Sequence, residues 1–234
     1  MQRSVLVTGG SRGIGAAIAE AFLAQGDKVA VVQRSAKAPE GAYVIECDVA
    51  DSRQVAAAFK EARKAHGPVE VLVNNAGISD DMLLMRMRDE QFFRVLETNL
   101  GGAFYATRCA YPDMVKKGWG RIIFVSSVVG LRGSEGQTNY AASKSAMVGL
   151  ARSLAREIGR HNVTVNVVAP GLIPTTLTQG LSAERQEQIL AETALQRSGT
   201  PGEVASAVTW LASGGAGFVT GAVIPVDGGL GMGH

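Results

Sequence analysis

The segment SVLVTGGSRGIG, residues 4–15, decides the fold of this chain. Its first half is a short run of β-branched and apolar residues, which is typical of a buried strand. Its second half is a glycine-rich turn that leads directly into a helical pattern over 13–25. Glycines let a backbone turn tightly and approach a pyrophosphate, which the N–H groups of a helix N-terminus bind. The segment therefore predicts a phosphate-binding turn, although its glycine spacing departs from the usual dinucleotide fingerprint.

Short β-branched runs alternate with longer helical patterns along the rest of the chain. This alternation is typical of parallel strands joined by helical crossovers, so the sequence predicts an α/β protein. The predicted strands are 4–8, 28–33, 43–46, 69–74, 121–126, 164–168 and 222–226. The predicted helices are 13–25, 52–66, 89–117, 140–159 and 201–213, and the connection 34–41 is too short for another helix.

The length and composition indicate one domain. At 234 residues and 46% hydrophobic content, the chain can bury a core of its own, so we expect a single domain over 1–234. The stretch 171–200 is irregular apart from a helix-like segment at 182–192. Long excursions of this kind are often lids, so we expect a substrate lid here.

Composition argues against several classes of protein. The chain has 23 Lys and Arg against 21 Asp and Glu, and its net charge of +2 gives no general attraction to nucleic acid or to an anionic membrane. Two cysteines, Cys47 and Cys109, and three histidines without ligand spacing predict neither a disulfide scaffold nor a metal site. Without an export signal or an apolar run of ~18–20 residues, we expect a cytoplasmic protein.

The stretch TNYAASK, residues 138–144, opens a helical run and carries a tyrosine and a lysine. Tyr140 and Lys144 lie one turn apart on the same helix face. An ammonium within about 4–6 Å lowers the pKa of a phenol from ~10, so Tyr140 is predicted to donate or accept a proton. Ser127 ends a strand-like run and offers a hydroxyl for a substrate oxygen. The alternative is an ordinary half-buried tyrosine beside a lysine with no catalytic role.

The end of the second predicted strand bears on the choice of dinucleotide. In NAD enzymes an acid near this position binds the adenosine 2′-hydroxyl. This chain has Gln33 and Arg34 there, and Arg12 in the glycine-rich turn supplies a second cation. Arginine recognises phosphate through a planar fork, so the sequence predicts NADP(H) rather than NAD. An exposed Arg34 without a ligand is the alternative.

Two further segments follow predicted strands. Asp48-Val49 comes after the third strand, and Asn75-Ala76-Gly77 comes after the fourth. Open α/β sheets bind their ligands at the carboxyl ends of the strands. Small residues permit a close backbone approach, and the Asp48 carboxylate could accept a hydrogen bond from an adenine amino group. Either segment taken singly could be an ordinary turn.

Taken in order, these motifs resemble the short-chain dehydrogenase/reductase family. The resemblance rests on TGxxxGIG at 8–15, Asp48-Val49, Asn75-Ala76-Gly77, Asn99, Ser127, Tyr140-x-x-x-Lys144 and Pro170-Gly171. It implies a single doubly wound Rossmann-type parallel sheet of seven strands, with helices on both faces, that binds a nicotinamide cofactor. The cofactor-binding residues that it implies are Gly9, Ser11, Arg12, Gly13, Ile14, Gly15, Arg34, Asp48, Val49, Asn75, Ala76, Gly77, Tyr140 and Lys144, with Ile173 and Thr175 at the carboxamide.

The resemblance also implies catalytic roles for four residues. Tyr140 would be the general acid, and Ser127 would hydrogen-bond the substrate carbonyl. Lys144 would hold the nicotinamide ribose and lower the pKa of the tyrosine. Asn99 would position a water that links Lys144 to solvent.

Within the family, the chain is most similar to the 3-oxoacyl-[acyl-carrier-protein] reductases of fatty acid biosynthesis. The similarity is carried by LLMRM at 83–87, ETNL at 97–100, GQTNYAA at 136–142 and TVNVVAPG at 164–171. It implies NADPH-dependent reduction of a 3-oxoacyl group on acyl carrier protein to the (3R)-3-hydroxyacyl group by a homotetramer. For 83–87 alone, plain core packing of an apolar segment is the alternative.

The subgroup docks its acidic carrier protein on basic residues at the rim of the cleft. The basic residues of the matching regions, for which ordinary solvated side chains are the alternative, are Lys116, Lys117, Arg121 and Arg160.

Two departures from the subgroup concern specificity. The loop between the second and third strands is shorter, so we expect a more open adenosine end. In the lid, Pro174, Thr176 and Leu177 replace acidic and Met positions, which leaves the acyl-chain preference open.

Two other functions remain as hypotheses. One is a paralogue that acts on polyketide, very-long-chain acyl or small ketone, alcohol and sugar substrates. The other is a non-catalytic dinucleotide-binding scaffold on the same fold, which would have no need of the four catalytic residues together.

Overall fold

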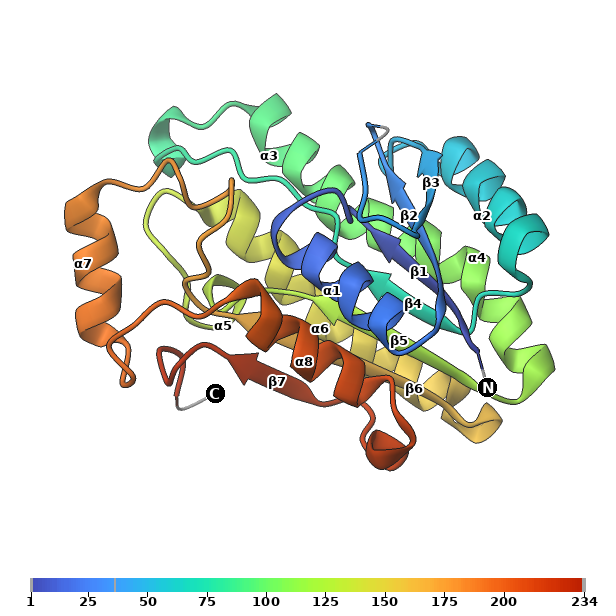
Figure 1. Ribbon diagram of the computed structural model, residues 1–234. Coiled ribbons are helices and arrows are strands. Elements are labelled where there is room, and N and C mark those ends of the chain that lie inside the picture. The colour runs from blue at the N-terminus through green and yellow to red at the C-terminus, as the bar shows by residue number, and fades with distance from the viewer. Residues whose placement is uncertain (1, 36, 233–234) are drawn as a thin grey trace.

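Seven strands form one sheet in which every neighbouring pair is parallel (Figure 1). The computed structural model describes residues 2–35 and 37–232, so His234, one of the three histidines, lies outside the described residues. The order is β3-β2-β1-β4-β5-β6-β7. The strands are β1 (Ser4–Thr8), β2 (Lys28–Gln33), β3 (Tyr43–Glu46), β4 (Val71–Asn74), β5 (Gly120–Val125), β6 (Val163–Pro170) and β7 (Val223–Val226).

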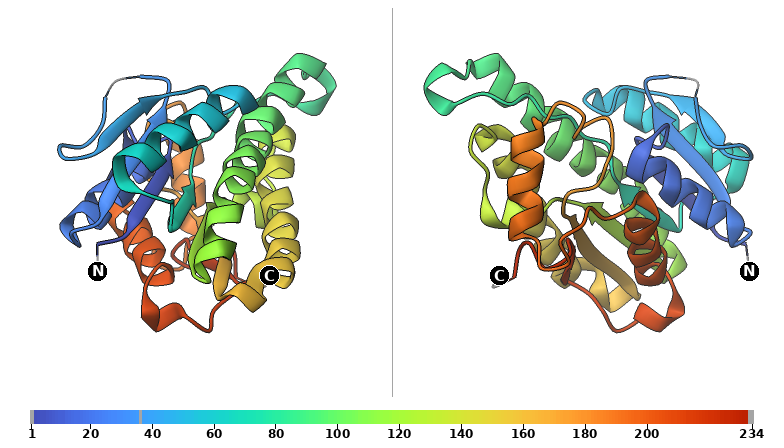
Figure 2. Two further views of the ribbon diagram at one scale, coloured as in Figure 1. Left: turned by 90° about the vertical axis from the view of Figure 1, so that its right-hand side faces the viewer. Right: turned by 60° about the vertical axis from the view of Figure 1, so that its left-hand side comes forward.

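Helices cover both faces of this sheet (Figures 1 and 2). The helices α1 and α8 lie on one face, and α2, α4 and α6 lie on the other. The α-helices are α1 (Gly13–Ala24), α2 (Ser52–His66), α3 (Asp89–Leu96), α4 (Gly102–Lys117), α5 (Val129–Arg132), α6 (Thr138–Ile158), α7 (Ala183–Glu192) and α8 (Pro201–Leu211). Shorter elements are the 3₁₀ turns Leu84–Arg86, Gly159–His161 and Gly214–Ala216 and the π-helical turn Glu97–Gly101.

The core consists of two layers, one on each face of the sheet. In β1, Leu6 packs toward α2, α4 and α6, whereas Val5 and Val7 pack toward α1 and α8. All five residues of β1 are buried. Parallel strands that are covered on both faces need apolar side chains at successive positions, which explains the continuous apolar run in the sequence. The predicted α/β fold with a doubly wound, seven-stranded parallel sheet is confirmed.

The strand order reverses between β1 and β4, because the chain proceeds outward to β3 and then returns to start the other half. Such a reversal leaves a crevice at the carboxyl ends of the two central strands, where connections depart to opposite faces. The glycine-rich turn after β1 and the loop after β4 both lie at this edge. The topology thus brings segments more than sixty residues apart to one site.

Most predicted elements match the structure within one or two residues, with one substantive difference. The predicted helix 89–117 is divided into α3 and α4 by the π-helical turn Glu97–Gly101. A π turn adds one residue within an otherwise continuous helix and has no characteristic residue types, so the sequence pattern does not reveal it. The four-residue helix α5 was not predicted either, because so short a segment has no measurable periodicity.

The alternative interpretation of the apolar segment 83–87, that it packs in the core, is wrong. Leu84 is 67% exposed and Met85 is 92% exposed. In the described part of the chain, the connection after β2 is a loop, as predicted. No helix among the described residues combines the length and the apolar character that a membrane crossing requires.

Candidate active site

Two adjoining cavities lie at the carboxyl edge of the sheet. The first, a groove of about 430 Å³, runs from the turn after β1 to the end of β3. The second, of about 540 Å³, lies between the end of β5, the start of α6 and the α7 segment. The predicted cofactor residues that line the groove are Gly9, Ser11, Arg12, Gly13, Ile14, Gly15, Arg34, Asp48, Val49, Asn75, Ala76, Gly77 and Thr175. Those of the predicted site that line the second cavity are Ile14, Asn75, Gly77, Ser127, Tyr140, Lys144, Ile173 and Thr175.

The turn after β1 is shaped so that only glycine fits at two positions. Gly9 has φ +70°, and a Cβ there would lie 2.9 Å from the Cα of Ala76. A Cβ on Gly15 would lie 2.1 Å from the carbonyl oxygen of Gly9. Helix α1 begins with no side-chain cap from Arg12, so the N–H groups of its first turn face the groove with their partial positive charge. This arrangement fits the pyrophosphate of a dinucleotide.

Thr8 and Asn75 connect the ends of the two central strands. The Thr8 hydroxyl accepts hydrogen bonds from the backbone N–H groups of Asn75 and Ala76, both at 3.0 Å. The Asn75 amide nitrogen donates to the carbonyl oxygens of Thr8 at 3.0 Å and of Gly9 at 2.8 Å. Asn75 therefore holds the glycine turn in place, in addition to lining the groove.

The adenosine end of the groove carries a glutamine whose amide is turned into the loop. Gln33 is buried, and its Nε2 donates to the carbonyl oxygens of Ser35 and Lys37. Its Oε1 is buried and has no hydrogen-bond partner within the described structure. Arg34 is exposed and lines the same wall. No acid therefore occupies the end of β2.

The tyrosine, serine and lysine meet in the second cavity. Ser127 and Tyr140 both line this cavity, and Ser127 is near enough to lower the pKa of the phenol. The Val129 N–H donates to Ser127 Oγ at 3.1 Å. Lys144 is only 3% exposed, and its Nζ donates to the carbonyl oxygen of Val125 at 2.8 Å. That nitrogen lies 5.6 Å from the centre of the Tyr140 ring. The two hydroxyls are therefore adjacent, with a buried cation beside them.

The prediction that Lys144 lowers the pKa of Tyr140 is wrong for this structure. Burial raises the pKa of the phenol to about 12, the hydrogen bond from Ser127 lowers it, and the Asp81 carboxylate raises it further. Burial also lowers the pKa of Lys144 to about 8. Desolvation disfavours the charged form of both groups, and it is the largest cause of both shifts.

Asn99 lies behind the crevice wall and does not line it. Its side chain is fully buried, accepts from the Ile78 N–H at 2.8 Å, and donates to the Ile78 carbonyl and to Ser143 Oγ, both at 3.0 Å. A Cβ placed on Gly77 would lie 3.2 Å from Asn99 Oδ1 and 3.4 Å from Lys144 Nζ. Asn99 and Lys144 thus flank the same glycine, and the side-chain amide of Asn99 is already used by protein groups.

Sequence reasoning missed several groups that build this site. The Ser143 hydroxyl joins Asn99 to the backbone of Tyr140, to which it donates at 2.8 Å. Asp81 and Gln137 lie in the second cavity and are hydrogen-bonded to each other at 2.8 Å. The adjacent acids of SDD at 79–81, in the loop that follows the fourth strand, were the signal for Asp81.

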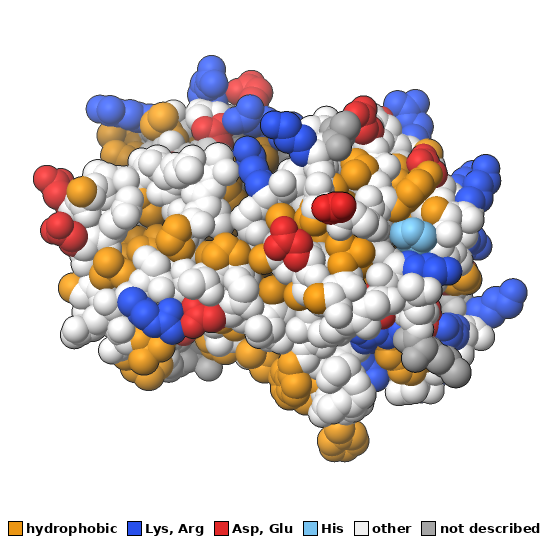
Figure 3. Space-filling view, in the orientation of Figure 1, with side chains coloured by type: hydrophobic (Ala, Val, Ile, Leu, Met, Phe, Trp, Pro, Cys, Tyr) orange, Lys and Arg blue, Asp and Glu red, His pale blue; other side chains and the backbone are white. Residues whose placement is uncertain are grey.

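The basic residues predicted at the rim of the cleft lie elsewhere in this chain. Lys116 and Lys117 end α4, Arg121 starts β5, and Arg160 follows α6, so all four are at the amino edge of the sheet. Arg121 is only 3% exposed and stacks on Trp119. The prediction that these residues lie at the rim of the cleft is therefore wrong for the isolated chain. They lie at the edge of the sheet opposite the crevice. On the face in Figure 3, charges of both signs are interspersed.

Within residues 2–35 and 37–232, no group of three or more His, Cys, Asp or Glu could hold a metal ion. Cys47 lines the groove as a thiol whose pKa burial raises to about 11, and Cys109 is also free. A thiol of this kind is unreactive near neutral pH.

The fold and this site define a class of protein. A family model described as enoyl-(acyl carrier protein) reductase matches residues 9–231. The chain belongs to the short-chain dehydrogenase/reductase family, which makes it an oxidoreductase that uses a nicotinamide dinucleotide.

Its relatives share nearly the whole chain. It is 52% identical over 234 residues to the 3-oxoacyl-[acyl-carrier-protein] reductase MabA of Mycobacterium tuberculosis, covering 100% of this chain and 95% of the relative. The MabA of Mycobacterium avium is 51% identical, with 100% and 92% covered. The 3-oxoacyl-[acyl-carrier-protein] reductase FabG of Escherichia coli is 43% identical over 238 residues, with 97% and 96% covered. The predicted family and the similarity to this subgroup are confirmed.

The link between β1 and β4 predicts the effect of removing one oxygen. Thr8→Val leaves the N–H groups of Asn75 and Ala76 without their acceptor, at a cost of roughly 1–3 kcal/mol in the free energy of unfolding. We expect weaker dinucleotide binding as well, because the glycine turn loses its support. Denaturant unfolding and a nucleotide titration measure the two effects. Thr8→Ser, which keeps the oxygen, is the matched control, and a valine variant as stable as the serine variant would contradict the assignment.

Proposed function

We propose that this chain is an NADPH-dependent 3-oxoacyl-[acyl-carrier-protein] reductase that forms (3R)-3-hydroxyacyl-[acyl-carrier-protein] in fatty acid biosynthesis. The names of its relatives support the reaction and the carrier. The observation that carries the proposal is the pair of adjacent hydroxyls, Ser127 and Tyr140, beside a buried Lys144 in a cavity continuous with the phosphate-binding groove.

The residues around the second cavity suit the reduction of a ketone. The bound nicotinamide supplies the hydride. The Ser127 hydroxyl holds the ketone oxygen, and Tyr140 gives that oxygen a proton as it gains charge. Burial favours the protonated phenol, which is the form that an acid needs before the reaction. Lys144 would hold the ribose hydroxyls, and the Asn99 side chain fixes the wall behind Gly77.

The same proposal assigns the cofactor-binding residues. The glycine turn and the first turn of α1 hold the pyrophosphate. Asp48 and Val49 flank the adenine, and Asn75, Ala76 and Gly77 form the floor between the cavities. At the far end, Ile173 and Thr175 contact the carboxamide. A Cβ on Gly13 would lie 3.1 Å from the Thr175 methyl group, so Thr175 lies directly against the glycine turn.

Preference for NADPH rests on the end of β2. Gln33 directs its amide nitrogen into the following loop, which leaves the wall to Arg34 and Arg12, both exposed. These two guanidinium groups would bind the 2′-phosphate of NADPH, whereas an NAD enzyme would need an acid there.

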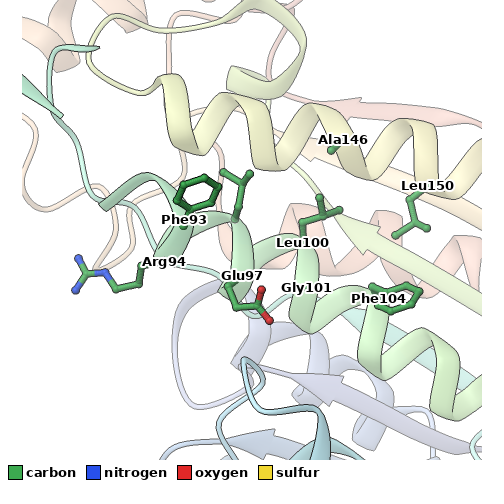
Figure 4. Close-up of a pocket in the computed structure, with 9 residues that line it drawn as sticks. Phe93, Arg94, Glu97, Leu100, Gly101, Phe104, Ala146 and Leu150 are labelled. Atoms are coloured by element: carbon green, nitrogen blue, oxygen red, sulfur yellow. The ribbon is translucent and has the colours of Figure 1, made fainter. Parts of the chain in front are cut away.

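We further propose that residues 1–234 act as one domain in which 171–200 is the lid, and that the protein is a homotetramer. A hollow on α3, α4 and α6 exposes apolar side chains (Figure 4). Phe93 and Phe104 are 62% and 43% exposed. They lie on either side of Leu100, and Leu150 extends from the neighbouring helix α6. A second copy of this chain covers such a face with the same face of its own, as two-fold symmetric interfaces do.

Turnover tests the reaction. With NADPH and an acetoacetyl thioester, we expect the parent protein to oxidise the cofactor and Tyr140→Phe to lose activity by roughly 10²–10⁴-fold, because the proton donor is gone. Tyr43→Phe, on exposed β3, is the matched control. A crotonyl thioester tests enoyl reduction, which the description of the family model names. Activity on the crotonyl substrate alone, or full activity of Tyr140→Phe, would refute the proposal.

A paired titration tests the cofactor. The parent is expected to prefer NADPH, and Arg34→Asp is expected to lose much of that preference, because a carboxylate repels the 2′-phosphate and binds a ribose hydroxyl. Arg53→Asp, at a side chain 92% exposed outside the groove, controls for the charge change. Equal use of NADH and NADPH by the parent would show that the two arginines do not select the phosphate.

Sedimentation tests the assembly. We expect the parent to sediment as a tetramer and Phe104→Glu to sediment as a smaller species, because a carboxylate within the apolar face must be desolvated on association. Tyr43→Glu changes another exposed aromatic away from this face and is expected to leave the tetramer intact. A monomeric parent would rule out the proposed assembly.

A further inference from the structure

Two adjacent carboxylates in the loop after β4 have different surroundings. Asp80 pairs with Arg94 and accepts from Gln91 Nε2 at 3.0 Å, on the side of α3. Asp81 lines the second cavity, where it accepts from Gln137 Nε2 at 2.8 Å and from the Ser79 hydroxyl. Only the second of these acids therefore faces the reacting groups.

The loop is fixed to the first turn of α6, which carries the tyrosine. Gln137, the partner of Asp81, is the residue before α6, and its carbonyl accepts from the Ala141 N–H at 2.7 Å. Asn139 Nδ2 donates to the backbone oxygen of Asp80 at 2.9 Å. The Met82 N–H donates to the carbonyl of Gly136 at 2.8 Å. These bonds hold the Asp81 carboxylate at a constant position relative to Tyr140.

The Asp81 carboxylate has neutral partners only. Among the described residues it forms no ion pair, in contrast to Asp80. Its hydrogen bonds come from the Gln137 amide and the Ser79 hydroxyl, neither of which carries a charge. A fixed negative charge therefore faces the cavity that holds the phenol.

The other charged groups around the cavity are accounted for. Lys144 lies on the same helix as Tyr140 and bonds to Val125. The remaining charged side chains that line the cavity are Arg132, Glu135 and Arg185. Arg132 from α5 pairs with Glu192, and Arg185 from α7 is hydrogen-bonded to Ser134 and Gln188. After burial, which is the largest cause, Asp81 is the charged group that raises the pKa of Tyr140.

We propose that Asp81 is a positioning residue that keeps the Tyr140 phenol in its proton-donating form through the charge of its carboxylate and through the Gln137 contact at the start of α6. The inference rests on the proposed function, since it concerns the acid of that reaction. A phenol next to a fixed anion ionises less readily, so it retains the proton until the ketone oxygen develops charge.

The reverse reaction gives the sharpest test. Oxidation of a 3-hydroxybutyryl thioester with NADP needs the phenolate as base, so kcat/KM rises with pH as the phenol ionises. Asp81→Asn removes the negative charge and keeps an acceptor for Gln137. We expect the rising limb to move to lower pH by roughly half a unit, the effect of one charge in a partly solvated site. On that limb the rate rises about threefold at constant pH.

Two variants separate charge from structure. Asp80→Asn removes the neighbouring charge, which lies outside the cavity. The rising limb of its kcat/KM–pH profile should coincide with that of the parent. Asp81→Glu keeps the charge, so its limb should also stay, even if the altered length lowers the maximal rate. If Asp81→Asn does not fold, Asp81→Ser removes the same charge with a smaller side chain and must show the same displacement.

The outcomes distinguish this inference from the proposed function. If the parent interconverts the thioesters with NADP(H) and the limb of the charge-removing variant does not move, the role of Asp81 is refuted and the reductase remains. If the parent acts on neither thioester, the proposed function itself fails. An equal shift in Asp80→Asn and Asp81→Asn would indicate a general loss of negative charge and would also refute the role of Asp81.

Discussion

The structure depends on the connection between the carboxyl ends of β1 and β4. At this point the sheet reverses its direction of growth, and the two strands send their chains to opposite faces. Thr8 and Asn75 join the two ends through hydrogen bonds of 2.8–3.0 Å. Because these bonds include the carbonyl of Gly9, they determine the conformation of the glycine turn as well as the spacing of the strands. The phosphate-binding groove follows from this constraint.

The second cavity places ionisable groups where water is scarce. Lys144 has a backbone carbonyl as its hydrogen-bond partner and no carboxylate, and burial lowers its pKa to about 8. Burial raises the pKa of the Tyr140 phenol, to about 12. Both shifts come from desolvation, so the cavity favours neutral groups before the reaction. Such an environment strengthens any later interaction with developing charge, because the surrounding dipoles are already oriented.

The architecture could be predicted in detail because it depends on local patterns. The first three strands and α2 were predicted to the residue, since buried parallel strands and amphipathic helices have distinct periodicities. The site residues could be named because they follow strand ends, where ligands bind in open α/β sheets. The π turn around Asn99, the contact between Asp81 and Gln137, and the position of Arg121 could not be predicted. Each depends on which segments lie side by side in space.

The amino-acid sequence by itself determined the parallel sheet, the glycine turn, the set of polar residues at the strand ends and the family. Its strand and helix periods and its residue types carry this information locally. Only the tertiary structure decided the protonation preferences of Tyr140 and Lys144, the inward orientation of Gln33, the separation of Asp80 from Asp81, and the burial of Arg121. The physical reason is that solvation and charge contacts depend on three-dimensional neighbours, which sequence spacing alone does not specify.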